Sequence, residues 1–219
     1  MLVKDYMTRH PLMAGPTMSI VEAQRYMGEN NIRHLPIVGD GKRLLGLVTR
    51  QRLLVDPGKL GSLDVWEITR YLSSLAVKDV MIKARDVISI DSDATIEQAA
   101  RAMVKKKIGC LPVLEESIVV GIITEADLLA HLTDLMGGKV SGVRITVRIP
   151  DRIGEFAKVT AAIASQGWGI YAAGCVPAPK DPGYWDAVFK VRHVPQEALV
   201  TVLSQVEDQR IVDVREIRE

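Results

Sequence analysis

The chain repeats itself once, and this repeat constrains the fold more than any other feature of its 219 residues. The copies share four segments in the same order. The second and third pairs of matching segments lie 76 residues apart, and the fourth pair lies 75 residues apart. The second copy has therefore lost one residue in the turn between its third and fourth segments. A single copy would bury too little surface, so we expect the two copies to pack together. The matching segments are "VKDYM" at 3–7 and "VKDVM" at 77–81, "SIVEAQRYM" at 19–27 and "TIEQAARAM" at 95–103, "HLPIV" at 34–38 and "CLPVL" at 110–114, and "GLVTRQRLL" at 46–54 and "GIITEADLL" at 121–129.

Local signals give each copy the order strand, helix, strand, strand, helix. Ser19 and Glu22 form a capping box before an amphipathic stretch, and Thr95 and Gln98 repeat the arrangement. A short strand with a proline follows, and because proline cannot donate to a ladder, this strand belongs at a sheet edge or begins with the proline. A second apolar strand then ends at a threonine, where the last helix begins. The segment "DVWEITRYLSSL" at 64–75 predicts a helical linker between the copies.

The last third of the chain has a different pattern. After the flexible joint "GGKVSG" at 137–142, the alternating "VRITVRI" predicts a half-buried strand. An amphipathic helix with Phe156 and Val159 on its apolar face follows and ends at Gly167. Two strands, a helix and a last strand complete the order βαββαβ, which is typical of a ferredoxin-like domain. The fold class is therefore α/β (α+β), with two βαββα repeats followed by a βαββαβ domain.

Composition narrows the functional classes. The formal charge is +1, which favours neither nucleic acid nor an anionic membrane as a partner, and "KKK" at 105–107 is best interpreted as a solvated helix face. The N-terminus lacks the apolar run of a signal peptide and no stretch is long enough to cross a bilayer, so we expect a soluble, cytoplasmic protein. Cys110 and Cys175 lie far apart in apolar stretches, which predicts reduced thiols without a metal site. No catalytic motif is present, so we expect no enzyme activity and no catalytic cofactor.

The duplicated segments, taken in order, resemble a tandem pair of CBS domains, also called a Bateman pair. This resemblance implies a pseudo-twofold disc with two clefts, which in that family hold adenosine-type ligands such as AMP, ADP, ATP or S-adenosylmethionine. We expect the boundaries to be 1–57 for the first repeat, 58–76 for the linker, 77–136 for the second repeat and 141–219 for the C-terminal domain.

The T-x-x-D motif formed by Thr124 and Asp127 suits a nucleotide on physical grounds. A carboxylate accepts two hydrogen bonds at once, and the vicinal ribose hydroxyls present two donors. The threonine hydroxyl lies at the start of a helix, where the dipole favours phosphate. A simple helix cap is the alternative, since both residue types are common in first turns.

The resemblance further implies which residues share the cleft with this motif. Backbone groups of Met13 and Leu35 would meet the adenine edge, and Arg33 and His34 would approach the phosphates. Arg33 is the better phosphate partner because its charge is permanent and its donors are forked. The complete nucleotide site is expected to comprise Thr8, Pro11, Met13, Arg33, His34, Leu35, Pro36, Thr124 and Asp127.

The other cleft departs from the family pattern because Arg52 stands where the second repeat has Asp127. Arginine has no acceptor, so it cannot replace the carboxylate towards ribose hydroxyls. Arg52 either directs its charge at a phosphate in the intact cleft or faces solvent. We therefore expect one nucleotide per chain, with the second cleft altered or empty. Its residues would include Thr49, Arg52, Val87, Cys110 and Pro112.

The segment "IPDRIGEFAKV" at 149–159 resembles the D-R-x-G turn of ACT domains, which often bind amino acids between paired copies. This resemblance implies an amino-acid site around Asp151, Gly154 and Glu155. A CBS pair followed by an ACT-like domain is similar to acetoin-utilisation accessory proteins. We expect a non-catalytic regulatory protein that senses an adenine nucleotide, relays it through a homodimer and acts on a regulated enzyme. The alternative is an amino-acid-responsive regulatory subunit whose CBS pair is mainly structural.

Overall fold

A computed structural model describes residues 1–54, 66 and 74–217. The chain divides into two compact units, Met1–Leu128 and Leu129–Glu219, and each is described by itself. The predicted helical linker at 58–76 falls, except for Trp66 and residues 74–76, outside the described residues. Over the part of the chain that the structure describes, every helix is too short or too polar to span a membrane.

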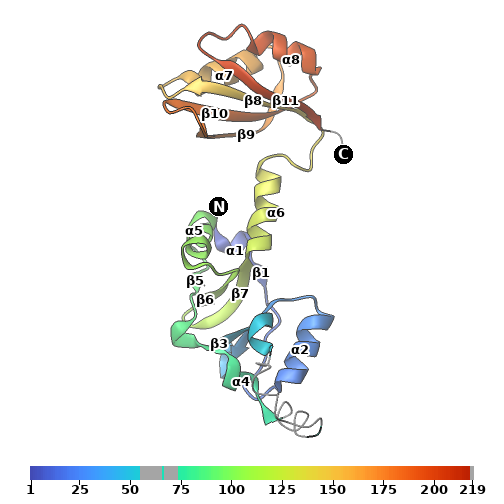
Figure 1. Ribbon diagram of the computed structural model, residues 1–219, viewed down its shortest axis with the longest axis vertical. Coiled ribbons are helices and arrows are strands. Elements are labelled where there is room, and N and C mark those ends of the chain that lie inside the picture. The colour runs from blue at the N-terminus through green and yellow to red at the C-terminus, as the bar shows by residue number, and fades with distance from the viewer. Residues whose placement is uncertain (55–65, 67–73, 218–219) are drawn as a thin grey trace. The chain divides into compact units, whose positions relative to one another are not determined.

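The two repeats of the first unit have similar orders of helices and strands (Figure 1). In the first repeat the elements are α1 (Val3–Tyr6), β1 (Thr8–Arg9), α2 (Ile20–Glu29), β2 (His34–Val38), η1 (Asp40–Lys42), β3 (Leu44–Thr49) and η2 (Arg50–Leu53). In the second they are α4 (Val77–Val80), β4 (Ile82–Lys83), η4 (Ala84–Asp86), β5 (Ile90–Asp91), α5 (Ile96–Lys106), β6 (Cys110–Glu115), β7 (Ile118–Thr124) and α6 (Glu125–Leu135).

The predicted order βαββα needs two corrections. "VKDYM" and "VKDVM" each begin with a four-residue helix, α1 or α4, which the predicted order lacks. The first repeat also closes with the short 3₁₀ helix η2, whereas the corresponding α6 runs for 11 residues. A physical reason for this second difference lies in the sequence, because Pro57 and Gly58 follow η2 within a few residues and disfavour a longer helix.

The repeats exchange their opening segments. Strand β1 of the first repeat pairs with β7 of the second, with Thr8 opposite Ile122. Strand β4 of the second repeat pairs with β3 of the first, with Leu47 opposite Ile82. The two resulting sheets have the orders β1-β7-β6-β5 and β2-β3-β4, so each contains a strand from the other repeat.

Backbone hydrogen bonds reinforce this exchange at the entrance to each long helix. The amide of Val3 donates to the carbonyl of Ala94 at 2.8 Å, just before α5. The amide of Val77 donates to the carbonyl of Met18 at 2.8 Å, just before α2. The opening helix of each repeat therefore closes the core of the other, and Val3 and Val77 are both fully buried there.

The predicted capping boxes form to different extents. Thr95 and Gln98 bond reciprocally, with side-chain to backbone distances of 3.2 and 2.9 Å. At the first repeat, the Ser19 hydroxyl accepts from the Glu22 amide at 3.1 Å. The described residues show no return bond from the Glu22 side chain, so only half of that box is present.

The shared glycines "GLVT" and "GIIT" are explained by the exchange. A β-carbon on Gly46 would overlap the carbonyl oxygen of Ile82 and lie 2.6 Å from the sulfur of Met81. A β-carbon on Gly121 would overlap the sulfur of Met7. The opening segment of one repeat thus lies directly on the bare α-carbon of the other, and this close approach requires glycine.

The second unit has the element order βαββαβ: β8 (Gly142–Pro150), α7 (Glu155–Ser165), β9 (Gly169–Pro177), β10 (Tyr184–Arg192), α8 (Gln196–Leu203) and β11 (Arg210–Ile217). Its antiparallel sheet has the order β11-β8-β10-β9, and α7 and α8 cover one face (Figure 1). Alternate residues of β8 and β10 pack against Val159, Ile163 and Leu199 in a core centred on Phe189. The element order is the one predicted from the sequence, whereas the assignment of this unit as an ACT domain stays a prediction.

Ion pairs occupy the sheet face that the helices leave uncovered. Arg148 on β8 donates to both carboxylate oxygens of Asp186 on β10, at 2.7 and 2.9 Å. Arg144 reaches Asp213 on β11 at 3.1 Å.

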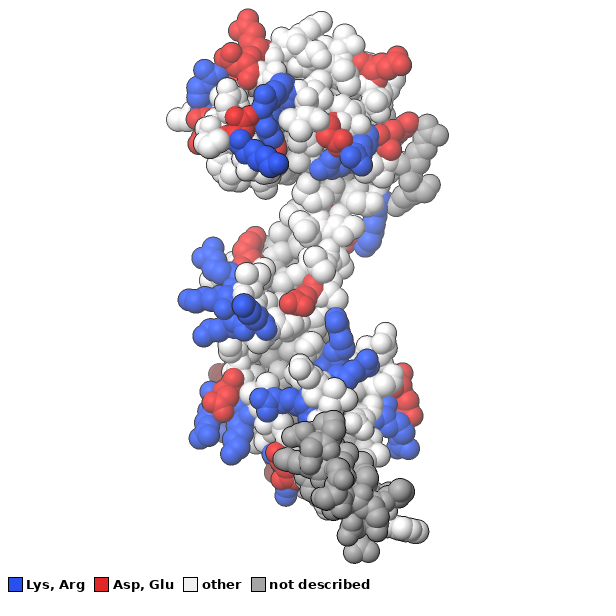
Figure 2. All heavy atoms as spheres, viewed as in Figure 1, with Lys and Arg blue, Asp and Glu red and all other residues white. Residues whose placement is uncertain are grey.

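In the first unit, Lys and Arg side chains gather over α5 (Figure 2), and all three lysines at 105–107 are exposed, as the predicted solvated face requires.

We predict that Gly46→Ala lowers the free energy of unfolding by about 1–3 kcal/mol, the range for overpacking a close contact. Gly121→Ala should cost less, because the flexible Met7 side chain can move. Urea denaturation of the full chain measures both. Gly28→Ala is the control, since open space surrounds this helical glycine and alanine there should be neutral or stabilising. An unchanged midpoint for Gly46→Ala would contradict this account of the exchange.

Candidate functional site

The exchange creates two cavities between the repeats. We call cavity A the space of about 350 Å³ whose lining brings the start of α6 together with the first repeat. The pairing of β1 with β7 explains the location, because Thr8 opposite Ile122 carries the following residues past Thr124. The described lining of cavity A is Thr8, His10, Pro11, Leu12, Asn31, Ile32, Arg33, His34, Ile122, Thr124, Ala126 and Asp127.

Six of the nine residues expected at the nucleotide site line cavity A: Thr8, Pro11, Arg33, His34, Thr124 and Asp127. Met13, Leu35 and Pro36 are absent from the described lining, and their place in the site stays a prediction. Leu35 and Pro36 are buried in β2, and Leu35 belongs to the core of the first repeat. The expected contacts of Met13 and Leu35 used their backbone groups, and those contacts stay a prediction.

Sequence reasoning missed six lining residues, and two of them carried a signal. His10 and Asn31 have φ angles of 49° and 50°, in the left-handed region that asparagine tolerates well. Both lie in the connections next to predicted site residues. The signal available in the sequence was proximity, because His10 and Asn31 lie within two residues of predicted site residues. The others are Leu12, Ile32, Ile122 and Ala126.

Asp127 forms a helix cap and still presents an oxygen for a ligand. Its Oδ2 accepts from the Thr124 amide and from the Thr124 hydroxyl, both at 2.7 Å. Among the described residues, Oδ1 has no hydrogen-bond partner. The cap interpretation is therefore right for one carboxylate oxygen, and the ribose interpretation is compatible with the other. The Thr124 hydroxyl hydrogen is already donated to Asp127, which leaves the expected phosphate contact to other donors.

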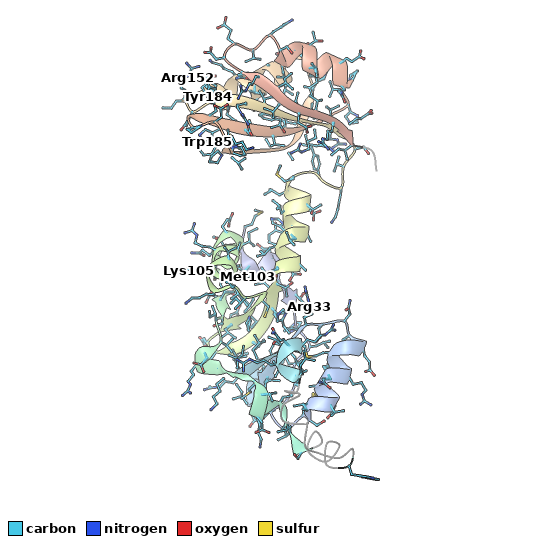
Figure 3. The ribbon with its side chains drawn as sticks, in the orientation of Figure 1. Arg33, Met103, Lys105, Arg152, Tyr184 and Trp185 are labelled. Carbon is cyan, nitrogen blue, oxygen red and sulfur yellow. The ribbon has the colours of Figure 1, made fainter. Side chains whose placement is uncertain are left out.

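Arg33 and His34 form a wall between the cavities, because both line cavity A and its neighbour. Arg33 (Figure 3) is exposed, whereas His34 is half-buried. Burial lowers the pKa of His34 and the nearby charge of Arg33 lowers it further, while Glu125 acts in the opposite direction. The imidazole is thus held mainly neutral at pH 7, and an anion placed beside it would favour its protonation.

Cavity B is the pseudo-symmetric counterpart, with a volume of about 590 Å³. It is the larger of the two, so the second cleft has not collapsed. Of the residues expected there, Thr49, Val87 and Cys110 belong to its lining. Its described lining is Arg33, His34, Leu47, Thr49, Arg50, Gln51, Leu54, Ile82, Asp86, Val87, Ile88, Lys107, Ile108, Gly109, Cys110 and Glu125.

Arg52 and Pro112 are absent from the described lining of cavity B, and their place in a second site stays a prediction. The Arg52 guanidinium instead donates to the carbonyl of Val80 at 3.5 Å, and its side chain is exposed. Of the two interpretations of Arg52, the solvent-facing one therefore fits the structure. Pro112 is buried in β6 opposite Ile122.

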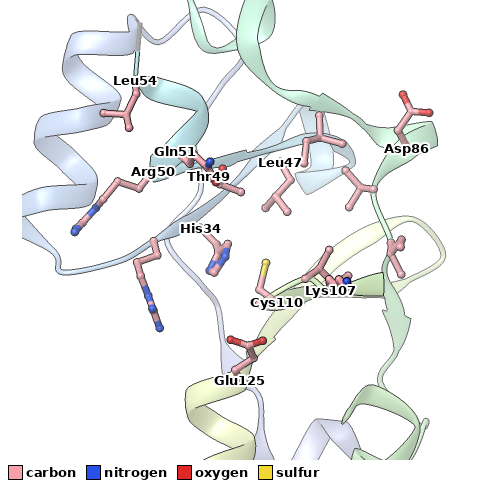
Figure 4. A pocket seen from close by; sticks show the side chains of 16 residues that line it. His34, Leu47, Thr49, Arg50, Gln51, Leu54, Asp86, Lys107, Cys110 and Glu125 are labelled. Carbon is pink, nitrogen blue, oxygen red and sulfur yellow. The ribbon is translucent and has the colours of Figure 1, made fainter. Parts of the chain in front are cut away.

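Cys110 lies where cavity B meets the core. It packs with Leu47, Ile122 and Val87 and is 3% exposed. His34 and Glu125 lie close to it (Figure 4). Burial raises the pKa of the Cys110 thiol to about 12, and the charge of Glu125 contributes. The thiol is therefore protonated at neutral pH and is part of the packing, not a nucleophile.

In the second unit, the three residues of the expected amino-acid site differ in role. Asp151 lines a cavity of about 330 Å³ together with Arg152 and Tyr184, at one end of the sheet (Figure 3). Gly154 has a φ of 93° and begins α7. Glu155 is buried, and its Oε1 accepts from Arg152 at 2.9 Å and from Lys158 at 3.0 Å, which lowers its pKa. Glu155 is absent from the described lining and holds the turn together instead.

Comparison with known proteins identifies the first unit. The CBS domain family matches residues 3–56 and 77–134, just over half of the chain. The chain therefore belongs to the CBS domain family, with two CBS domains in tandem. The match ends at residue 134 and does not extend over the C-terminal domain.

Individual relatives agree with this placement. The chain is 31% identical over 134 residues to the protein MJ1225 of Methanocaldococcus jannaschii, covering 59% of this chain and 46% of that one. It spans less than half the length of the first curated relatives that it matches.

Two solved structures are similar in fold. One is a Vibrio cholerae protein described as an acetoin utilization protein (AcuB), with a TM-score of 0.53 and 33% identity, over 64% of this chain and 95% of that one. The other is the CBS domain pair of MJ0100, solved with 5′-methylthioadenosine and S-adenosyl-L-methionine, with a TM-score of 0.50 and 28% identity, over 64% of this chain and 98% of that one.

We predict that Cys110 resists thiol reagents in the folded protein. At pH 8 a thiol with a pKa of about 12 is ionised in roughly one molecule in ten thousand. The Cys175→Ser variant, which retains Cys110, should react with a disulfide reagent only after unfolding in guanidinium. The matched Cys110→Ser variant retains the exposed Cys175 and should react in the folded state. Equal folded-state rates for both variants would contradict this prediction.

Proposed function

We propose that the protein is a non-catalytic regulator that binds an adenine nucleotide, AMP, ADP, ATP or S-adenosylmethionine, in cavity A. The single observation that carries this proposal is the composition of the cavity wall. Asp127 of the second repeat and Arg33 of the first line the same space, so an acceptor for a sugar diol faces a donor for a phosphate.

The proposed contacts follow from the hydrogen bonds already made. The Oδ1 atom of Asp127 accepts a ribose hydroxyl while Oδ2 keeps the helix cap. Arg33 binds the phosphate end, and a bound phosphate raises the pKa of the neighbouring His34 so that it also donates. Thr8 and Pro11 complete the wall beside β1. The backbone of Met13 and Leu35 bonds the adenine edge.

The related CBS pair of MJ0100 supports the ligand class, because its structure contains two adenosine compounds. The similarity to the AcuB protein of Vibrio cholerae supports a place among acetoin-utilisation accessory proteins. A ligand between the repeats changes their relative packing only if it binds one packing more tightly than another. In this proposal a homodimer relays that change to a regulated enzyme.

We predict that one adenine nucleotide binds per chain and that Asp127→Asn abolishes most of this affinity. Asparagine can keep its amide oxygen in the cap towards Thr124, but it then presents a donor to the ribose instead of an acceptor. Losing one hydrogen bond to a charged acceptor costs about 1.5–3 kcal/mol, roughly a 10- to 150-fold weaker dissociation constant. Isothermal titration calorimetry with AMP, ADP, ATP and S-adenosylmethionine measures it.

Asp134→Asn is the matched control for this titration. Asp134 lies on the same helix and pairs with Lys139 at 2.7 Å, outside the described lining of cavity A. Its substitution should leave binding unchanged. The assignment of cavity A fails if no adenine compound binds, or if the two variants bind alike.

A second candidate function is amino-acid sensing by the C-terminal unit, which is proposed to be an ACT-like domain. Two observations favour it: Asp151 lines a cavity, and open space surrounds the α-carbon of Gly154 at the start of α7. A ligand carboxylate can approach such a backbone closely. In this case the CBS pair is mainly structural.

For this second candidate we predict that one amino acid raises the melting temperature of the full chain in a concentration-dependent way. Gly154→Ala should abolish the shift, because it puts a methyl group where the ligand approaches. Gly167→Ala is the control, since Gly167 also has a positive φ of 74° and open space around it but lies outside the described lining of this cavity. The idea is rejected if the 20 standard amino acids leave the melting temperature unchanged.

A further inference from the structure

Cavity B has a lining that differs in chemistry from that of cavity A. Aliphatic side chains from both repeats form much of its wall. They come from β3, the residue after η2, the start of β4, the segment between η4 and β5 and the segment before β6, so both repeats contribute. These side chains offer a ligand an apolar surface, which favours binding of an apolar group. The aliphatic residues are Leu47, Leu54, Ile82, Val87, Ile88 and Ile108.

Three basic side chains share this wall, Arg33, Arg50 and Lys107, and Arg50 also donates to the carbonyl of Ile32 at 3.4 Å. In the described part of the chain, none of the three forms an ion pair with a carboxylate. Elsewhere in the protein, arginines such as Arg144 and Arg148 are paired. Cations that are left unpaired beside an apolar cavity attract an anion.

The acidic residues of the wall do not supply the missing ribose acceptor. Asp86 pairs with Arg85 at 3.4 Å and points away from His34 and Cys110 in Figure 4. Glu125 lines cavity B beside His34 and Gly109, and it is absent from the described lining of cavity A. The position equivalent to Asp127 is Arg52, which bonds a backbone carbonyl. Cavity B therefore lacks the acceptor that a vicinal diol needs at this position.

We propose that cavity B binds an organic anion with an apolar body and no vicinal diol, such as an aliphatic carboxylate or phosphate monoester. The apolar body contacts the aliphatic wall around Val87, and the anionic group lies between Arg50 and Lys107 at the rim. This inference goes beyond the proposed nucleotide site, because it assigns a different ligand class to a different cavity.

Calorimetric titration of the full chain with octanoate and with octyl phosphate tests the proposal. Each should bind with one site per chain, whereas 1-octanol and inorganic phosphate should bind far more weakly, because each supplies only half of the ligand. Arg50→Gln should weaken octanoate binding roughly 3- to 10-fold, a modest effect because this arginine is exposed to solvent. Arg52→Gln is the matched control, since it removes the same charge two residues away and outside the described lining.

Val87→Asp addresses the apolar half of the site, because it places a negative charge in the wall and should abolish octanoate binding. Urea denaturation checks that the Val87→Asp variant folds. If this variant does not fold, the comparison of octanoate binding by Arg50→Gln and Arg52→Gln tests the proposal instead. The proposal is overturned if 1-octanol binds as tightly as octanoate, if the two arginine variants behave alike, or if AMP occupies two sites per chain. Asp127→Asn should leave octanoate binding intact, so a failure of the nucleotide site is distinguishable from a failure of this one.

Discussion

The exchange of opening segments between the two CBS repeats is the interaction on which the rest of the first unit depends. Each opening helix places a buried valine, Val3 or Val77, in the other repeat, and each following strand extends the other repeat's sheet. Neither repeat can complete its sheet or close its helix entrance alone. Because the exchanged contacts connect residues far apart in the chain, we expect the two repeats to fold cooperatively as one unit.

The same exchange places both cavities between the repeats, so each cavity takes part of its wall from each copy. A substitution at a residue that lines one cavity alone changes that cavity and leaves the lining of the other intact. Asp127 lines cavity A alone, whereas Arg52 at the equivalent position is absent from the described lining of both cavities. Duplication followed by divergence gives two cavities whose linings differ in chemistry within a symmetric frame. Because Arg33 and His34 line both cavities, a charge placed in either cavity interacts electrostatically with groups that also line the other.

Much of this fold could be predicted from the sequence, since the repeat, the capping boxes and the proline-bearing strands are local or periodic signals. The six elements of the C-terminal unit were equally visible in their hydrophobic patterns. The helices α1 and α4 were missed because four residues carry no periodicity. The strand exchange was missed because β1 and β4 have two residues each and acquire their partners only in the folded chain.

The sequence also could not predict the roles of single atoms in the candidate site. The motif T-x-x-D indicated both a cap and a ligand contact, and the sequence could not divide these roles between the two oxygens of one carboxylate. The structure assigns the cap to Oδ2, which accepts two hydrogen bonds from Thr124, and shows no partner for Oδ1 among the described residues. Arg52 shows the reverse, since it occupies the matching sequence position but bonds Val80 outside the cavity. Equivalent sequence positions in the two repeats therefore have equivalent backbone positions in the fold. Whether the side chain at such a position lines a cavity depends on the partners that the side chain itself binds.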